Sequence, residues 1–344
     1  MRRKDSHIIS SCVTSFILFP RAQTDGSNHN SDLLRAIATA GNGSYYYVEG
    51  VDDIRNAFGD CLGGVLSVVA QNIELTIEAV NGAKISKVHH RNAKTVEEGK
   101  IFTVNFADLY GEEQRDVLAD VVLPKGRPVV KNLTTPEAQV VRCRLRYVDL
   151  IQARPAEAAT VAALLRPAGS LSAAKRLATY GPDNVHLELQ SLRLRVASTL
   201  ELARRQADSG NLSAGRALVT KMQAEVKEAD ARLRAVQSSA SASVDSAEIE
   251  LADSLLSNFS EDLRDCLEGM VDQDIYSRVT SKKMAYMSAG HMNQRCAESR
   301  LETPDMMQGE LLDGMGSIAS APISLRKNAY RTKTKDAKAK KFWG

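Results

Sequence analysis

The chain has 344 residues, of which 43% are hydrophobic and 25% charged, so it is long enough for two or three domains with ordinary cores. The formal net charge of +3 is small for this length, which excludes an overall electrostatic drive toward nucleic acid or anionic membranes. Only 5% of the residues are aromatic, so we expect cores of leucine, valine, isoleucine and alanine.

The five cysteines are dispersed and form no CxxC pair; they are Cys12, Cys61, Cys143, Cys266 and Cys296. This spacing argues against a disulfide framework and against a zinc site, and it predicts a reducing compartment, the cytoplasm. Secretion is the alternative, because Asn-x-Ser/Thr sequons begin at Asn42, Asn132, Asn211 and Asn258.

The N-terminus has some features of a signal peptide, because Arg2, Arg3 and Lys4 precede an apolar run from Ile8 to Phe19. Serines and threonines interrupt that run, and no A-x-A cleavage site follows it. The run is also too short to span a bilayer. We therefore expect a buried strand here.

Residues 24–72 have the pattern of a helix, a glycine turn, a short strand and a second helix. Ser31-Asp32 can cap the first helix, whose apolar residues recur at helical spacing until Gly41. Residues 45–48 are aromatic and β-branched, which predicts a strand. The second helix contains the pair Gly63-Gly64, which we expect to permit close packing against the following domain.

From residue 72 the hydrophobic period changes to two, which is typical of strands. The Asn81-Gly82 dipeptide is a strong hairpin signal. Alternating or β-branched runs are found at 73–77, 85–88, 102–106, 117–123, 140–147 and 160–165. Six short strands with turn residues between them predict an antiparallel β-sandwich.

From Asp183 onward the pattern is helical. Apolar residues step by three and four through 189–203, 218–233 and 249–266, with Asn211 as the expected cap of the second helix. A weaker helix is predicted for Gln273–Ser288. These elements predict an antiparallel helical bundle.

The end of the chain, residues 307–344, has the composition of a disordered tail, and its segment 326–341 carries a net +7, leaving −4 for the rest of the chain. Its basic residues are Arg326, Lys327, Arg331, Lys333, Lys335, Lys338, Lys340 and Lys341. A solvated tail is the simpler interpretation, and weak contact with lipid or RNA is the alternative.

Three stretches match one family in order. They are GNGSYYYVEGVDDIRNAFGDCLGGVLSVVAQNIEL from Gly41, FADLYGEEQRDVLADVVLP from Phe106, and the helical segment Asp183–Val226 with the later HMNQR from His291. The sequence resembles proteins in which a von Willebrand factor A (VWA) domain is followed by a VWA-integrating region. That group includes VWA–RING ubiquitin ligases, and inter-alpha-trypsin inhibitor heavy chains share a looser version of the β-domain.

The resemblance implies an α+β multidomain protein with a partial α/β, Rossmann-like VWA remnant, an antiparallel β-sandwich and an antiparallel helical bundle. The expected units are 1–70 for the C-terminal portion of a truncated VWA domain, 71–168 for the β-sandwich, 183–300 for the helical bundle and 307–344 for the tail.

The metal site of a VWA domain needs a D-x-S-x-S loop, whose oxygen ligands suit Mg²⁺, and this sequence contains no such loop. Asp25 in the TDG segment is the nearest remnant, and we expect no metal site from it. Mg²⁺ would bind only if a segment upstream of this chain supplied the loop. The eight closely spaced cysteine and histidine ligands of a RING finger are also absent from the sequence.

No catalytic motif stands out. Glu112, Glu113 and Asp116 flank Arg115, an arrangement that we interpret as an ion-pair cluster on a surface hairpin. His89 and His90 are interpreted as an exposed polar pair. The sequence therefore predicts a non-enzymatic protein–protein interaction module without catalytic or cofactor-binding residues. The alternatives are a substrate-binding fragment of a VWA–RING-type ubiquitin ligase system and a secreted adhesion protein.

Overall fold

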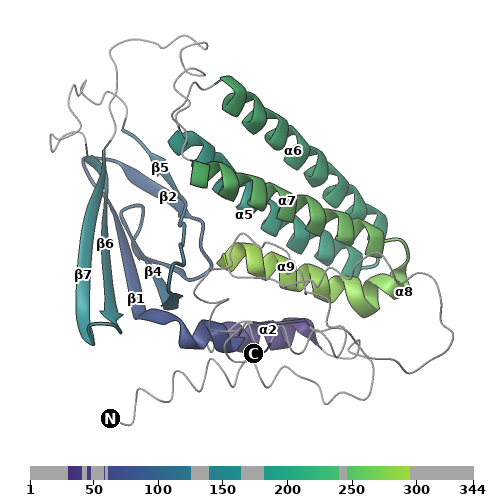
Figure 1. Ribbon diagram of the computed structural model, residues 1–344, viewed down its shortest axis with the longest axis horizontal. Helices are drawn as coiled ribbons and strands as arrows, with labels where there is room; N and C mark the ends of the chain where they lie inside the picture. Colours follow the sequence, from purple (N-terminus) through teal and green to yellow (C-terminus); the bar gives the residue numbers. More distant parts are fainter. Residues whose placement is uncertain are drawn as a thin grey trace, which may run out of the picture.

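The computed structural model describes seven stretches of the chain: residues 30–40, 45–47, 58, 61–124, 139–163, 182–239 and 246–294. In Figure 1 a layer of strands stands beside a stack of long helices, with α2 (Ser31–Ala40) lying along α9 (Ser281–Asn293). The protein is thus of mixed α and β structure, as the sequence predicts.

The strand layer contains an antiparallel sheet of five strands in the order β3-β4-β1-β6-β7, and a smaller sheet in which β2 pairs with β5. The strands are β1 (Val68–Ala79), β2 (Lys84–Val88), β3 (Ala93–Glu97), β4 (Ile101–Tyr110), β5 (Ala119–Val122), β6 (Gln139–Asp149) and β7 (Arg154–Ala163). One apolar cluster, which includes Ile77 of β1, Ile85 of β2 and Val104 of β4, joins residues of both sheets. The alternation of the sequence therefore reports burial correctly.

The Asn81-Gly82 turn forms, but the hairpin expected around it does not. Both residues have positive φ, +51° and +76°, the conformation that this dipeptide favours. The turn nevertheless links β1 of the large sheet to β2 of the small one, and the two strands do not pair. The sequence also missed β3, and it placed the start of β7 at Thr160 instead of Arg154.

The helices follow the predicted periodicity. They are α5 (Pro182–Asp208), α6 (Leu212–Ser239), α7 (Ser246–Gly269), the short α8 (Gln273–Ile275), the π-helical turn η2 (Tyr276–Thr280) and α9. Asn211 caps α6 as predicted, because its Oδ1 accepts the N–H of Ala214 at 3.2 Å. The weak helix expected over 273–288 is instead divided between α8, η2 and α9.

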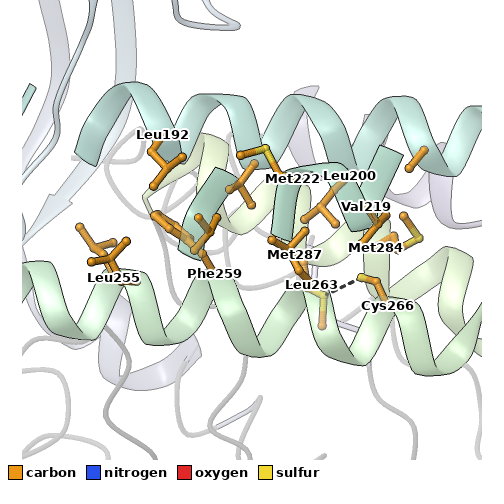
Figure 2. Packing of buried hydrophobic residues seen from close by; sticks show 14 of the residues in the cluster. Leu192, Leu200, Val219, Met222, Leu255, Phe259, Leu263, Cys266, Met284 and Met287 are labelled. Atoms are coloured by element: carbon orange, nitrogen blue, oxygen red, sulfur yellow. Dashed lines mark hydrogen bonds between the residues drawn. The ribbon is translucent and has the colours of Figure 1, made fainter. Parts of the chain in front are cut away.

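The helices enclose one apolar core (Figure 2), to which each long helix contributes. Leu200 of α5, Met222 of α6, Phe259 and Leu263 of α7, and Met287 of α9 point toward one another and are buried. Burial of such side chains is the main stabilising contribution to a helical assembly of this kind.

The segment before β1 differs from its prediction in one element. Tyr45, Tyr46 and Tyr47 do not form a strand; they pack with Tyr286 of α9. The close approach expected at the glycine pair is confirmed for Gly64, because a Cβ atom there would lie 3.0 Å from the ring of Tyr110 in β4. Within the described residues, α2 packs on α9, and no strand precedes β1.

A polar junction centred on Asp116 connects the strand layer with the helices. The Asp116 carboxylate accepts a hydrogen bond from Nε2 of Gln294 at 2.8 Å and lies 3.0 Å from Nε2 of His186. Its backbone N–H donates to Oε1 of Gln294 at 2.6 Å. The junction therefore brings together the FADLYGEEQRD and HMNQR stretches, which are more than 170 residues apart.

Arg193 of α5 completes this junction, and its side chain is almost fully buried. Its guanidinium donates to the carbonyl of His291 at 2.5 Å and to Oε1 of Gln190 at 2.6 Å. A longer contact of 3.5 Å reaches the carbonyl of Asp116. Because the arginine bonds both to the C-terminal turn of α9 and to the segment before β5, it fixes the strand layer relative to the helices.

Candidate functional site

A pocket of about 370 Å³ opens where α2, α5, α9 and the turn between β2 and β3 meet. Its lining residues come from all four elements: Arg35, Arg91, Ala197, Ser198, Glu201, Leu202, Arg205, Ser288, Ala289 and Met292. The described lining therefore holds three arginines and one glutamate among small or apolar side chains, which gives the pocket a surplus of positive charge.

Glu201 of α5 is the anion of this pocket and is engaged on several sides. Its carboxylate accepts two hydrogen bonds from Arg35 of α2, at 2.9 and 3.2 Å, and one from Arg205 at 3.3 Å. Burial works to raise the pKa of Glu201, but the hydrogen bonds and charges of Arg35 and Arg204 outweigh it and lower the pKa to about 2. Glu201 is therefore ionised at neutral pH and holds α2 against α5.

Arg204 lies behind the pocket and strengthens the same contact between helices. Its side chain is only 5% exposed, and it donates to both carboxylate oxygens of Asp32 at 2.8 and 3.2 Å. It also bonds Asp208 at 3.0 Å and Glu201 at 3.3 Å. Three carboxylates thus surround one buried guanidinium, so the charge of Arg204 is already compensated.

Arg91 differs from these arginines. It is exposed in the turn between β2 and β3, and it makes no hydrogen bond or ion pair with any residue that the structure describes. Desolvation and the nearby charge of Arg35 lower its pKa, while Glu201 opposes this effect. An arginine nevertheless stays protonated at neutral pH, so the pocket keeps an uncommitted cation at its edge.

The turn that carries Arg91 is held in place by its neighbours. His90 stacks edge-on against Phe106 of β4, with 4.9 Å between ring centroids, and its Nδ1 accepts the N–H of Asn92 at 3.2 Å. The side-chain amide of Asn92 donates to the carbonyl of Asn105 at 3.1 Å. Burial, then the charges of Arg115 and Arg91, lower the pKa of His90 to about 4, so the imidazole is neutral when it accepts this bond.

The arrangement is suited to binding a single negatively charged group. Arg91 and the outer nitrogens of Arg205 can both donate to an anion, and guanidinium groups match carboxylate geometry well. Arg35 and Arg91 are like charges near each other, so an anion between them would relieve their repulsion. Leu202, which is 48% exposed, and Met292 offer apolar contacts beside the charged group.

The residues singled out in the sequence contribute little to this pocket. Asp25 and the basic residues from Arg326 to Lys341 lie outside the described residues, and their roles stay predictions. The acidic cluster is only partly a surface feature: Glu112 is exposed, whereas the Glu113 side chain is 4% exposed and forms an ion pair with Arg115, and Asp116 belongs to the polar junction. The expected hairpin does not form because β4 and β5 belong to different sheets, and Asp116 contacts α5 and the end of α9 instead of solvent.

The adjacent histidines are also not an exposed pair. His89 lies 2.8 Å from the Asp120 carboxylate, and His90 packs against Phe106 beneath the turn of Arg91. Among the residues that the structure describes, no group of three or more His, Cys, Asp or Glu side chains is placed to hold a metal ion. No described helix is both long enough and apolar enough to cross a membrane.

Sequence reasoning missed the pocket because its residues come from distant parts of the chain. Arg35 and Glu201 are separated by 166 positions. One signal was available: Glu201, Arg204, Arg205 and Asp208 recur at helical spacing and mark a charged face of α5. That pattern alone does not distinguish a solvated face from a wall against α2.

Comparisons with known proteins give only a distant likeness. No protein-family model matches the sequence, and no curated protein does either. A solved structure described as von Willebrand factor type A from Catenulispora acidiphila is similar, with a TM-score of 0.45 and 12% identity over 79% of this chain and 57% of that one. The ArnB paralog VWA2 from Sulfolobus acidocaldarius gives a TM-score of 0.38 and 12% identity over 77% and 53% of the two chains.

The protein therefore has a distant structural similarity to proteins with VWA domains, and at 12% identity that similarity concerns the fold alone. The chain spans little more than half the length of each of these two proteins.

Proposed function

We propose that the protein is a non-enzymatic protein-binding module, and that its pocket between α2, α5 and α9 takes an acidic side chain of a partner protein. The observation that carries this proposal is Arg91, an arginine at the edge of the pocket without a partner among the described residues. Every other arginine that lines the pocket donates to Glu201.

The charge balance of the pocket favours a carboxylate over a polyanion. Glu201 stays ionised in the lining of the pocket, so it would repel a nucleotide triphosphate or a nucleic-acid backbone. A lone aspartate or glutamate side chain meets Arg91 and Arg205 and remains at the rim. The apolar side chains of Leu202 and Met292 then favour a hydrophobic residue next to the acidic one.

We also propose that the module is part of a VWA-containing protein without a metal-dependent adhesion site. The three motif stretches support the first part, and the absence of D-x-S-x-S from this sequence supports the second. Recruitment of ubiquitin ligase substrates and secreted adhesion stay predictions, since no described contact favours either of them.

The test is peptide binding to the full chain. One synthetic peptide library has a fixed central glutamate with randomised neighbours, and a matched library has glutamine at that position. We expect the glutamate library to be enriched, with leucine or another apolar residue beside the glutamate. Single selected peptides are then titrated by calorimetry.

The variant for this test is Arg91→Gln. The control is Lys87→Gln, which also removes one positive charge, but from an exposed position of β2. We expect Arg91→Gln to weaken binding at least about tenfold, as loss of a charge-assisted hydrogen bond does, and Lys87→Gln to change it less than about twofold. Equal enrichment of both libraries, or equal binding by the two variants, would contradict the proposal.

A further inference from the structure

The two edges of the five-stranded sheet are built differently. The edge strand β3 has only five residues, carries Lys94 and Glu97, and is interrupted by a register shift between Thr95 and Glu97. Short length, charge and irregular register are the features by which proteins prevent an edge strand from pairing with another chain.

The opposite edge, β7, lacks most of these features. It has ten residues, RPAEAATVAA, without a lysine, and it pairs regularly with β6 from Arg154 to Ala162. Its protecting features are Pro155 near its start and the charges of Arg154 and Glu157. Eight of its ten residues are exposed, and within the described residues no strand pairs along its outer edge.

The side chains of β7 leave room for a second strand. Five of them are alanines, so a neighbouring backbone can approach without steric conflict. Val161, which is 45% exposed, would gain apolar contact from such pairing. Figure 1 places β7 on the side of the sheet that faces away from helices α5 to α9, so the bundle does not obstruct this edge.

We propose that β7 is a self-association edge, at which two copies of this chain pair antiparallel about a two-fold axis to form a continuous sheet. A second copy is the occupant that fits the charges. In two-fold antiparallel pairing about Ala159, Glu157 of one copy lies opposite Val161 of the other, and Arg154 lies opposite a position beyond the end of the other β7, so no like charges face each other. The acid of this strand, Glu157, is already paired with Arg144 and Arg146 of β6, at 3.2 and 3.4 Å.

The interface would consist mainly of main-chain hydrogen bonds, because β7 offers little apolar area. We therefore expect a reversible, concentration-dependent dimer in place of an obligate one. Each copy would keep its own pocket, so the dimer would present two binding sites. This proposal is independent of the function proposed above, since it requires nothing of Arg91.

Sedimentation velocity of the full chain over a wide concentration range tests the proposal. The variant is Ala159→Lys, at an exposed position in the middle of β7, where two-fold pairing brings the two introduced charges close together. The control is Val96→Lys, which adds the same charge at an exposed position on the opposite edge, β3. Thermal unfolding of both variants verifies that they fold.

We expect wild type and Val96→Lys to dimerise alike, and Ala159→Lys to dissociate at least about tenfold more readily. An equimolar mixture of Ala159→Lys with Ala159→Glu should restore the dimer, because opposite charges then face each other. A wild-type chain that stays monomeric at the highest concentration overturns the proposal. So does an Ala159→Lys variant that dimerises like wild type, or, in a monomer, protection from hydrogen exchange of the β7 amides that do not donate to β6.

Discussion

Two arginines of this protein show the difference between a structural contact and a binding site. Arg193 is 1% exposed, and its guanidinium bonds to a side chain and to backbone carbonyls at the polar junction. Arg91 is exposed at the edge of the pocket, and among described residues its guanidinium has no partner. A buried cation is tolerated only when hydrogen bonds replace its lost hydration. An exposed cation stays hydrated until a ligand binds.

The largest expected effect is on stability, from removal of Arg193. Arg193→Met keeps a long apolar side chain but removes the donor that bonds to the carbonyl of His291 and to Oε1 of Gln190. We expect a loss of about 3 kcal/mol in the free energy of unfolding, measured with urea. The control Arg195→Met, which removes an arginine that is half exposed on the same helix, should lose less than about 1 kcal/mol. Equal losses of stability in Arg193→Met and Arg195→Met would show that the buried hydrogen bonds of Arg193 contribute no more than an exposed arginine does.

The second effect depends on pH and concerns the turn below Arg91. The pKa of His90 is lowered from 6.5 to about 4, so the folded protein binds this proton less readily than the unfolded chain. Stability from this group is therefore fully present above pH 6.5 and is lost as the pH falls toward 4, by up to about 3 kcal/mol.

The comparison variant for this effect is His90→Gln, which has no proton to gain in that range. Urea unfolding at the two ends of the range should show a smaller loss for the variant than for wild type. A wild-type loss no larger than that of His90→Gln would mean that His90 is not held in its neutral form.

A smaller loss is expected from Arg204→Met, because its main partner, Asp32, is already 56% exposed and can be solvated when the arginine is gone. We expect about 1–2 kcal/mol, together with faster hydrogen exchange in α2, which Arg204 ties to α5. Arg205→Met is the control, since its side chain is 71% exposed. Unchanged exchange in α2 would show that Arg35 and Glu201 alone hold this helix.

The smallest effect on stability is expected from Arg91→Gln, which removes a cation without a described partner. The free energy of unfolding should stay within about 0.5 kcal/mol of wild type. Because the charge of Arg91 helps to lower the pKa of His90, that pKa should rise slightly in the variant, as measured by NMR titration of the imidazole. Lys87→Gln should change neither quantity. If Arg91→Gln instead lowered the free energy of unfolding strongly, Arg91 would be a structural residue like Arg193.

Local patterns in the sequence were reliable where the physics is local. The three-and-four spacing of Leu189, Leu192 and Val196 predicted their burial in α5, since a helix places these positions on one face. The Asn211 cap was predicted correctly, and the turn at Asn81-Gly82 forms where the sequence predicted one, because both depend only on neighbouring residues. The strand at Tyr45–Tyr47 failed because contact with Tyr286 overrides an intrinsic preference.

What the sequence determined by itself is therefore the alternation and periodicity of the segments, their caps and turns, and the class of the fold. Only the tertiary structure decided which strands pair, so that the turn at Asn81-Gly82 joins two sheets instead of one hairpin. The tertiary structure also decided whether each arginine is buried and which partner it has. Arg35, for example, bonds to Glu201, which lies far from it in the chain. Local preference is encoded in neighbouring residues, whereas a guanidinium becomes a structural bond or an open site only when distant elements pack around it.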